Sequence, residues 1–146
     1  MKRFQNKVVL VTGGSRNTGL SIVQKFAEEG AAKVYMCGST PESTDNGAAI
    51  LESWGCRNIR SIPCDVSDPV QVQHLFDVIE QESGRLDILV NNAAHQGIGK
   101  PFTEMPSAYL MEVLGVNVRG GFQVTQQAVN RFFLKQPERG TVVFLS

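Results

Sequence analysis

Apolar residues along the chain gather into short continuous runs that alternate with longer segments of helical periodicity. A continuous apolar run bounded by turn residues is typical of a strand buried on both faces of a parallel sheet. Leu20, Val23 and Ala27 instead recur on one helical face, with Gln24 and Glu28 on the other, as in an amphipathic helix. The strands predicted on this basis cover residues 8–11, 33–37, 57–63, 86–90 and 141–145.

The segments between these strands are predicted to be helical. Asp68 is a suitable N-cap, Pro69 fits the first helical position, and Gly84 is a suitable stop. The last segment is expected to be kinked at Gly115 or at the Gly120-Gly121 pair. The predicted helices run from about 18 to 30, 44 to 54, 69 to 84 and 107 to 135. This alternation predicts an α/β fold with a doubly wound parallel sheet and helices on both faces.

Composition narrows the possible classes of protein. The 146 residues fit one domain, and the hydrophobic share of 42% is enough for a core. Net charge is zero and no Lys/Arg block is present, so we expect neither a nucleic acid nor an anionic membrane as partner. No apolar run is long enough to span a membrane, and residues 1–7 lack the apolar core of a signal peptide.

The few cysteines and histidines add a further constraint. Cys37, Cys56 and Cys64 show no Cys-x-x-Cys spacing, which is simplest to explain by a reduced, cytoplasmic protein. His74 and His95 are the only histidines, so we expect no metal site. We interpret His74 as a solvated helix residue.

The first strand leads directly into a glycine-rich turn. Gly13 and Gly14 allow a tight reversal that brings backbone N–H groups close to an anion, and the helix that follows points its positive end at the same place. A diphosphate would suit this geometry. The alternative is a strand-to-helix turn without a ligand, because an isolated glycine pattern is weak.

The turn resembles that of the short-chain dehydrogenase/reductase family. Thr12-Gly13-x-x-x-Asn17-x-Gly19 is similar to the family's Thr-Gly-x-x-x-Gly-x-Gly, with Asn17 in place of the middle glycine. Asn is the non-glycine residue that best tolerates a left-handed backbone, so we expect the turn to survive. The side chain adds bulk where a cofactor would approach.

Three further segments extend the resemblance over nearly the whole chain. Asp65-Val66 is similar to the pair that holds the adenine ring in the family, Asn91-Asn92-Ala93-Ala94 to its Asn-Asn-Ala-Gly motif, and Val116-Asn117-Val118 to a segment whose Asn holds a water in the proton relay. From the residues alone, a helix-initiating turn is the favoured interpretation of Asp65-Val66, and Asn91 and Asn92 could brace loops. Asn117, which we expect on the buried face of its helix, could equally cap a kink.

The resemblance implies a Rossmann-type fold and a nicotinamide dinucleotide as cofactor. Arg16 and the absence of a carboxylate after the second strand favour NADP(H) over NAD(H), although Arg16 could also be a solvated loop charge. Asn117 is the candidate catalytic residue, and His95 and Gln96 begin the implied substrate cleft. The candidate cofactor-binding residues are Gly13, Ser15, Arg16, Asn17, Thr18, Gly19, Gly38, Ser39, Asp65, Val66, Asn92 and Ala93.

The family's remaining catalytic residues are not found. Neither Tyr35 nor Tyr109 is followed four positions later by Lys, and Ser146 precedes the position of the active Ser by one. We therefore expect a single dinucleotide-binding domain over residues 1–146, truncated after the fifth strand and incomplete at its C-terminal end. It would be an inactive fragment of an NAD(P)-dependent oxidoreductase, acting on a small carbonyl or alcohol as a homo-oligomer when complete.

Two alternatives remain open. The chain could be a non-catalytic dinucleotide-binding or association module. A methyltransferase on a similar sheet is a weaker alternative, because nothing acidic lies in the glycine turn and the Asn-Asn-Ala-Ala segment would have no role there.

Overall fold

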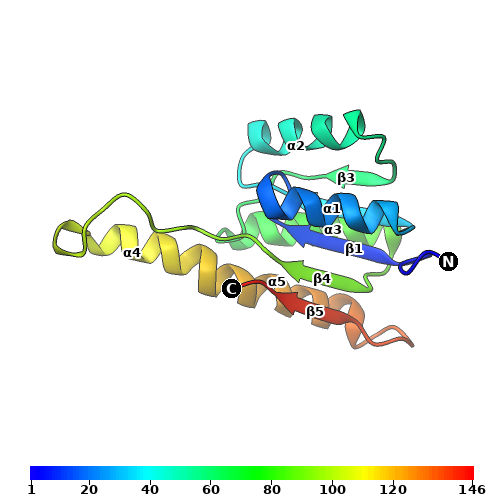
Figure 1. Cartoon of the computed structure of the whole chain (residues 1–146). Coiled ribbons are helices and arrows are strands. Elements are labelled where there is room, and N and C mark those ends of the chain that lie inside the picture. The colour runs from blue at the N-terminus through cyan, green and yellow to red at the C-terminus, as the bar shows by residue number, and fades with distance from the viewer.

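The computed structural model describes residues 1–146 and contains one parallel sheet of five strands in the order β3-β2-β1-β4-β5. β1 lies at the centre and all five of its residues are buried, which explains its unbroken apolar sequence. The doubly wound sheet predicted from the alternating pattern is thus confirmed (Figure 1). The strands are β1 Val8–Thr12, β2 Lys33–Cys37, β3 Ile59–Ser61, β4 Ile88–Asn91 and β5 Thr141–Phe144.

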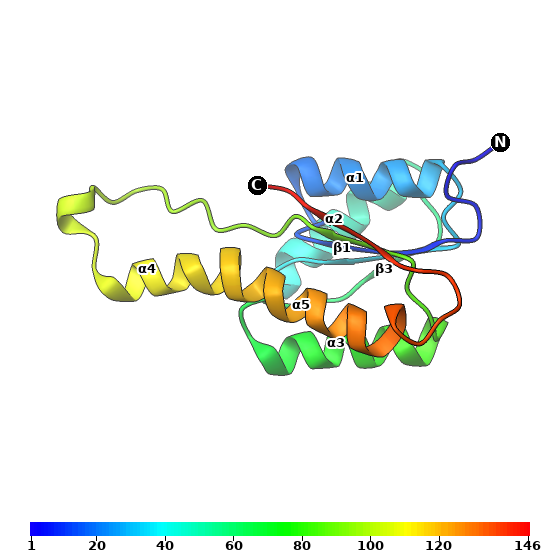
Figure 2. The same cartoon turned by 90° about the horizontal axis from the view of Figure 1, so that it is seen from below.

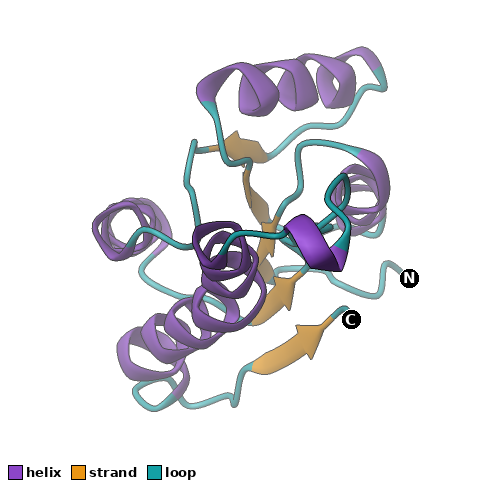
Figure 3. Cartoon of the chain, turned by 90° about the vertical axis from the view of Figure 1, so that its left-hand side faces the viewer, coloured by secondary structure: helices purple, strands orange, loops and turns teal.

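Helices cover both faces of this sheet (Figures 2 and 3). Alternate residues of β1 point to opposite sides, with Val9 and Val11 packing in the cluster of α1 and α2 and Val8 and Leu10 in that of α3 and α5. The helices are α1 Asn17–Glu28, α2 Pro41–Ser53, α3 Pro69–Ser83, α4 Ser107–Leu114 and α5 Gly121–Ala128, with a 3₁₀ turn η1 Phe102–Glu104 and π-helical segments η2 Gly115–Gly120 and η3 Val129–Phe133.

Helix starts follow their capping residues. The side chain of Asp68 accepts from the Val70 N–H at 2.8 Å, and Gly84 ends α3 in a left-handed conformation at φ 61°, as predicted. α2 begins three residues earlier than expected, because Thr40 caps it by accepting from the Ser43 N–H at 3.2 Å and Pro41 occupies the first position.

The segment predicted to be helical over 107–135 follows a helical path through α4, η2, α5 and η3. Its hydrogen bonding widens to the π pattern over Gly115–Gly120, the part of the segment where a kink is expected from the glycines. α4 extends away from the sheet (Figure 1). Apolar side chains spaced four residues apart are exposed along this segment, and we call them the apolar stripe: Leu110, Leu114, Val118 and Phe122.

β5 forms one edge of the sheet, and Val143, Phe144 and Leu145 are exposed there. An apolar edge strand offers unpaired backbone groups to another chain. No helix in the structure combines the length and apolar character needed to cross a membrane.

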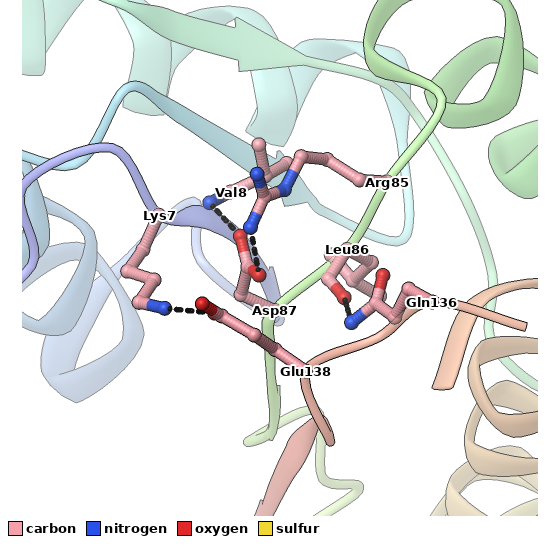
Figure 4. Close-up of polar contacts among 7 residues, drawn as sticks. All are labelled: Lys7, Val8, Arg85, Leu86, Asp87, Gln136 and Glu138. Carbon is pink, nitrogen blue, oxygen red and sulfur yellow. Dashed lines mark hydrogen bonds and ion pairs between the residues drawn. The ribbon is translucent and has the colours of Figure 1, made fainter. Parts of the chain in front are cut away.

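Polar contacts fasten the amino-terminal end of the sheet (Figure 4). Asp87, which is 5% exposed, accepts from the Val8 N–H at 2.7 Å and from the Arg85 guanidinium at 2.6 Å. Lys7 pairs with Glu138 at 2.8 Å, which ties the start of β1 to the loop before β5. All of these contacts lie at the amino-terminal end of the sheet, so none of them involves the carboxyl-terminal ends of the strands.

Candidate functional site

The turn between β1 and α1 is held in one geometry by the end of β4. Gly13 has φ +63° and Asn17 φ +49°, so Asn17 does adopt the left-handed backbone expected of it. The Thr12 hydroxyl accepts from the Asn92 and Ala93 N–H groups, each at 3.1 Å. The Asn92 side chain in turn donates to Thr12 O at 3.1 Å and Gly13 O at 3.0 Å. The side chain of Asn92 therefore braces the turn, which was the structural alternative for this residue.

Gly19 permits the close approach that this arrangement needs. A Cβ placed on Gly19 would lie 2.0 Å from Gly13 O and 2.5 Å from the Asn92 amide nitrogen. Gly19 lies in the first turn of α1, whose unpaired N–H groups face the same region. The turn can thus present backbone donors and a positive helix end to an anion.

A cleft of about 750 Å³ opens at the carboxyl ends of β1, β2 and β4. Open α/β sheets bind ligands at this end of their strands. The structure brings all of the candidate cofactor-binding residues to this one cleft: Gly13, Ser15, Arg16, Asn17, Thr18, Gly19, Gly38, Ser39, Asp65, Val66, Asn92 and Ala93. Their placement fits the expected site, and their role in binding stays a prediction.

One end of the cleft offers a hydrogen-bond acceptor beside a donor. Asp65 Oδ1 accepts from the Ser67 N–H at 2.9 Å and from the Ser67 hydroxyl at 2.8 Å. No protein hydrogen bond uses Asp65 Oδ2 or the Val66 N–H. A free carboxylate oxygen next to a free N–H can pair with an exocyclic amine and a neighbouring ring nitrogen.

A shelf of hydroxyl groups follows β2. Ser15 Oγ lies 2.8 Å from Ser43 Oγ, and a Cβ on Gly38 would come within 2.6 Å of Ser15 Oγ. Arg16 is exposed beside this shelf and forms no ion pair. Asp65 is the only carboxylate among the residues that line the cleft. Glu42 lines an adjoining pocket with Arg16 and the hydroxyl residues Ser15, Thr40 and Ser43, so one cation and one carboxylate lie beside the shelf.

The structure corrects the expected environment of Asn117. Its side chain is exposed rather than buried, and it lies outside the lining of the cleft. Asn117 Oδ1 accepts from the His95 N–H at 2.7 Å, and Nδ2 donates to His95 O at 2.9 Å. The Asn117 side chain provides hydrogen-bond partners for the N–H and the C=O of His95, and it can do so while exposed to solvent. Asn117 thus holds in place His95, which does line the cleft.

Several lining residues were not among the candidates. Thr40 and Ser43 could have been found from the capping signal at Thr40-Pro41, and Val116 from its place beside Asn117. Cys64 gives no such signal, because a cysteine before a turn suggests only packing; the Cys37 thiol and burial raise its pKa, so it stays a neutral part of the wall. The lining residues that were not candidates are Thr40, Ser43, Cys64, Ala94 and Val116.

His95 and Gln96, considered as substrate contacts, both lie at the β4 end of the cleft. His95 Nδ1 accepts from the Gly97 N–H at 3.1 Å, and its ring meets the Tyr109 ring edge-on at 5.5 Å between centroids. No cluster of three or more His, Cys, Asp or Glu side chains suited to a metal ion is present.

Known proteins resemble this chain over nearly its whole length. A family model described as short chain dehydrogenase matches residues 7–146. The chain is 32% identical to a 3beta-hydroxysteroid dehydrogenase of Mediterraneibacter gnavus, covering 100% of this chain and 51% of the relative. It is also 32% identical to (+)-borneol dehydrogenase 1 of Salvia officinalis, covering 98% and 53%.

Solved structures show the same likeness. A short chain dehydrogenase from Mycobacterium smegmatis superposes with a TM-score of 0.87 at 26% identity, over 99% of this chain and 59% of that one. The chain spans about half the length of the curated relatives it matches. Since the family model covers the chain from the start of β1 to its last residue, this protein belongs to the short-chain dehydrogenase/reductase family of oxidoreductases.

Proposed function

We propose that this chain binds NADP(H) in the cleft and belongs to an enzyme that transfers hydride between nicotinamide and a small carbonyl or alcohol. The observation that carries the proposal is the convergence of the glycine turn, the Asp65-Val66 pair and Arg16 on one cleft at the carboxyl ends of the strands. The relatives named as dehydrogenases support the reaction class.

The diphosphate would lie against the glycine turn. N–H groups at the start of α1 have no intrahelical partner, and the helix dipole favours negative charge there. Gly19 lets the start of α1 lie against the Gly13 carbonyl and the Asn92 side-chain amide, which places these N–H groups at the glycine turn. The adenine would lie at the other end, where Asp65 Oδ2 can accept from its amine and the Val66 N–H can donate to its ring.

The ribose next to the adenine would meet the hydroxyl shelf. NAD-specific sites place an acidic residue here to bind the 2′-OH, whereas this cleft has Gly38 and Ser39. Arg16 is free to pair with a 2′-phosphate, and a guanidinium matches phosphate geometry. These features support a preference for NADP(H).

The nicotinamide end would face Ala94, His95 and Gln96. When bound, the nicotinamide supplies or accepts the hydride. The residues described here contribute binding and orientation: Asn117 fixes the His95 backbone at the mouth of the cleft. Residues 1–146 contain no Tyr-x-x-x-Lys pair, so we assign no proton transfer from a tyrosine to this segment.

An association module is the second candidate. The apolar stripe and the β5 edge would be the contact surfaces of such a module. A module that only associates would show no saturable binding of a dinucleotide.

We propose that the complete enzyme is a homo-oligomer and, because its three cysteines are unpaired, a cytoplasmic protein.

Replacing Arg16 by alanine tests the cofactor preference. We expect the parent chain to bind NADPH more tightly than NADH, and Arg16→Ala to weaken NADPH binding about tenfold, because it removes a charge-assisted contact to the 2′-phosphate. NADH affinity should stay unchanged. Nicotinamide fluorescence measures both titrations.

Arg57→Ala is the matched control, since Arg57 is also exposed but lies outside the cleft. Equal affinity of the parent for the two cofactors, or an equal loss of both in Arg16→Ala, would contradict the preference. Failure of the parent to bind either cofactor would contradict the proposed function itself.

A further inference from the structure

The turn formed by residues 65–67 belongs to no helix or strand, yet its two free groups must be aimed accurately if they are to read a base. Asp65 and Val66 line the cleft, and their free carboxylate oxygen and N–H can serve a base there only while the turn keeps its present backbone. Part of that order is local, since Ser67 holds the Asp65 carboxylate. The local contacts do not fix the position of the turn relative to the sheet.

The helical residues on either side of the junction between η2 and α5 pack against this turn. The Arg119 guanidinium donates to Ser67 O at 2.9 Å, and the Gln123 side-chain amide donates to Val66 O. A Cβ on Gly120 would lie 2.7 Å from Val66 Cγ2, so the helix backbone itself lies close to the valine. These contacts span 52 and 57 residues of sequence.

The same helical stretch also reaches the cleft. Val116 lines it, and positions 116, 119, 120 and 123 share one face of a helix. The neighbouring Val118 and Phe122 lie on the exposed apolar stripe instead. One face of this helix therefore supports both the wall of the cleft and the turn that would contact the base.

We propose that Arg119 and Gln123 are positioning residues that set the preference of this site for an adenine base, by holding the carbonyls of Ser67 and Val66. The inference rests on the proposed function, because the base contacts of Asp65 and Val66 belong to it. Neither side chain lines the cleft, so both act through the turn.

A purely structural role would give a different result. If the two side chains only attached the helix to the neighbouring turn, their loss would lower stability or weaken all ligands alike. A positioning role predicts instead a loss of discrimination between bases. The hypoxanthine analogue of NADPH has a carbonyl in place of the adenine amine and a hydrogen on the neighbouring ring nitrogen. It therefore lacks the amine that Asp65 Oδ2 would accept from and the ring acceptor next to it.

The experiment titrates the 146-residue chain with NADPH and with this analogue, using nicotinamide fluorescence. We expect the parent to prefer NADPH at least tenfold, because the analogue loses the hydrogen bond to the charged Asp65 carboxylate and cannot offer the neighbouring ring acceptor to the Val66 N–H. Gln123→Met keeps the side-chain length and removes the donor. We expect it to weaken NADPH binding roughly threefold to tenfold, with the analogue nearly unaffected, so that the preference approaches unity.

Gln126→Met is the matched control, because Gln126 is exposed on the same helix and makes no contact with the turn. It should keep the parent's preference. Arg119→Met, at an exposed position, is a second test of the same role if Gln123→Met unfolds. The thermal unfolding midpoint of each variant shows whether it folds.

The outcomes separate the two proposals. Variants that fold, bind NADPH and keep the parent's preference would overturn the positioning role and leave the proposed function intact. A parent that binds NADPH and the analogue equally would also overturn the positioning role, since there would be no preference to set. A parent that binds neither would overturn the proposed function and this inference with it.

Discussion

Gly19→Ala should reduce NADPH binding by about a hundredfold, equal to about 3 kcal/mol, because it disturbs two or more backbone contacts to the diphosphate. The new Cβ would lie 2.0 Å from Gly13 O and 2.5 Å from the Asn92 amide, both of which are backbone or braced groups with little room to move. The chain should also lose about 1–3 kcal/mol of stability through overpacking. NADPH titration and chemical unfolding measure the two effects.

Gly115→Ala makes the same substitution where there is space. Its Cβ would meet Ser67 Cβ at 3.5 Å and the Arg119 guanidinium at 3.6 Å, which are ordinary contacts. We expect binding within about twofold of the parent, the difference of a few tenths of a kcal/mol usual for a tolerated change. If Gly19→Ala bound NADPH as well as Gly115→Ala does, the diphosphate could not lie at the glycine turn.

Asp87→Ala should destabilise the fold by about 3 kcal/mol, because it leaves the buried Val8 N–H without an acceptor and removes the partner of Arg85 (Figure 4). Arg85 is 45% exposed and can be solvated, which keeps the loss below that of a fully buried ion pair. Asp87→Asn retains an acceptor for Val8 and should cost about half as much. Urea unfolding followed by circular dichroism measures these differences.

Glu138→Ala is the surface counterpart. Glu138 pairs with Lys7 and is 68% exposed, so its loss should cost at most about 1 kcal/mol. If Asp87→Ala were no more destabilising than Glu138→Ala, the buried carboxylate would not hold the start of β1 in place. NADPH affinity of folded Asp87→Asn should equal that of the parent, since Asp87 lies outside the cleft.

The sheet could be predicted because its signals are local. β1, β4 and β5 contain short apolar runs and β2 is apolar after Lys33, whereas β3, Ile59–Ser61, has a single apolar residue and gives the weakest signal. The starts of α3 and α1 are marked by Asp68-Pro69 and by the glycine turn. The start of α2 at Pro41 was missed because the helix face formed by Ala48 and Leu51 appears only later in the sequence. The capping residue Thr40 and the following Pro41 mark the start of α2, which the apolar pattern does not show.

The site could be predicted to the extent that topology brings segments together. Parallel strands end at one edge, so residues after β1, β2, β3 and β4 meet there, and all the candidate cofactor residues line one cleft. The exposure of Asn117 could not be predicted, since it depends on the path of the loop around His95. The contacts of Arg119 and Gln123 with the turn at 65–67 depend likewise on helix rotation and have no signal in the sequence.

A nicotinamide dinucleotide should occupy the cleft at the carboxyl ends of the strands. Backbone amide NMR spectra recorded during NADPH titration test it most directly, because each residue reports separately. The account predicts saturable shifts in residues 13–19, 38–40, 64–67 and 92–96, and none at Asp87, Arg85 or Glu138 on the opposite end. Shifts confined to the apolar stripe or the β5 edge, or no saturable shifts, would contradict it.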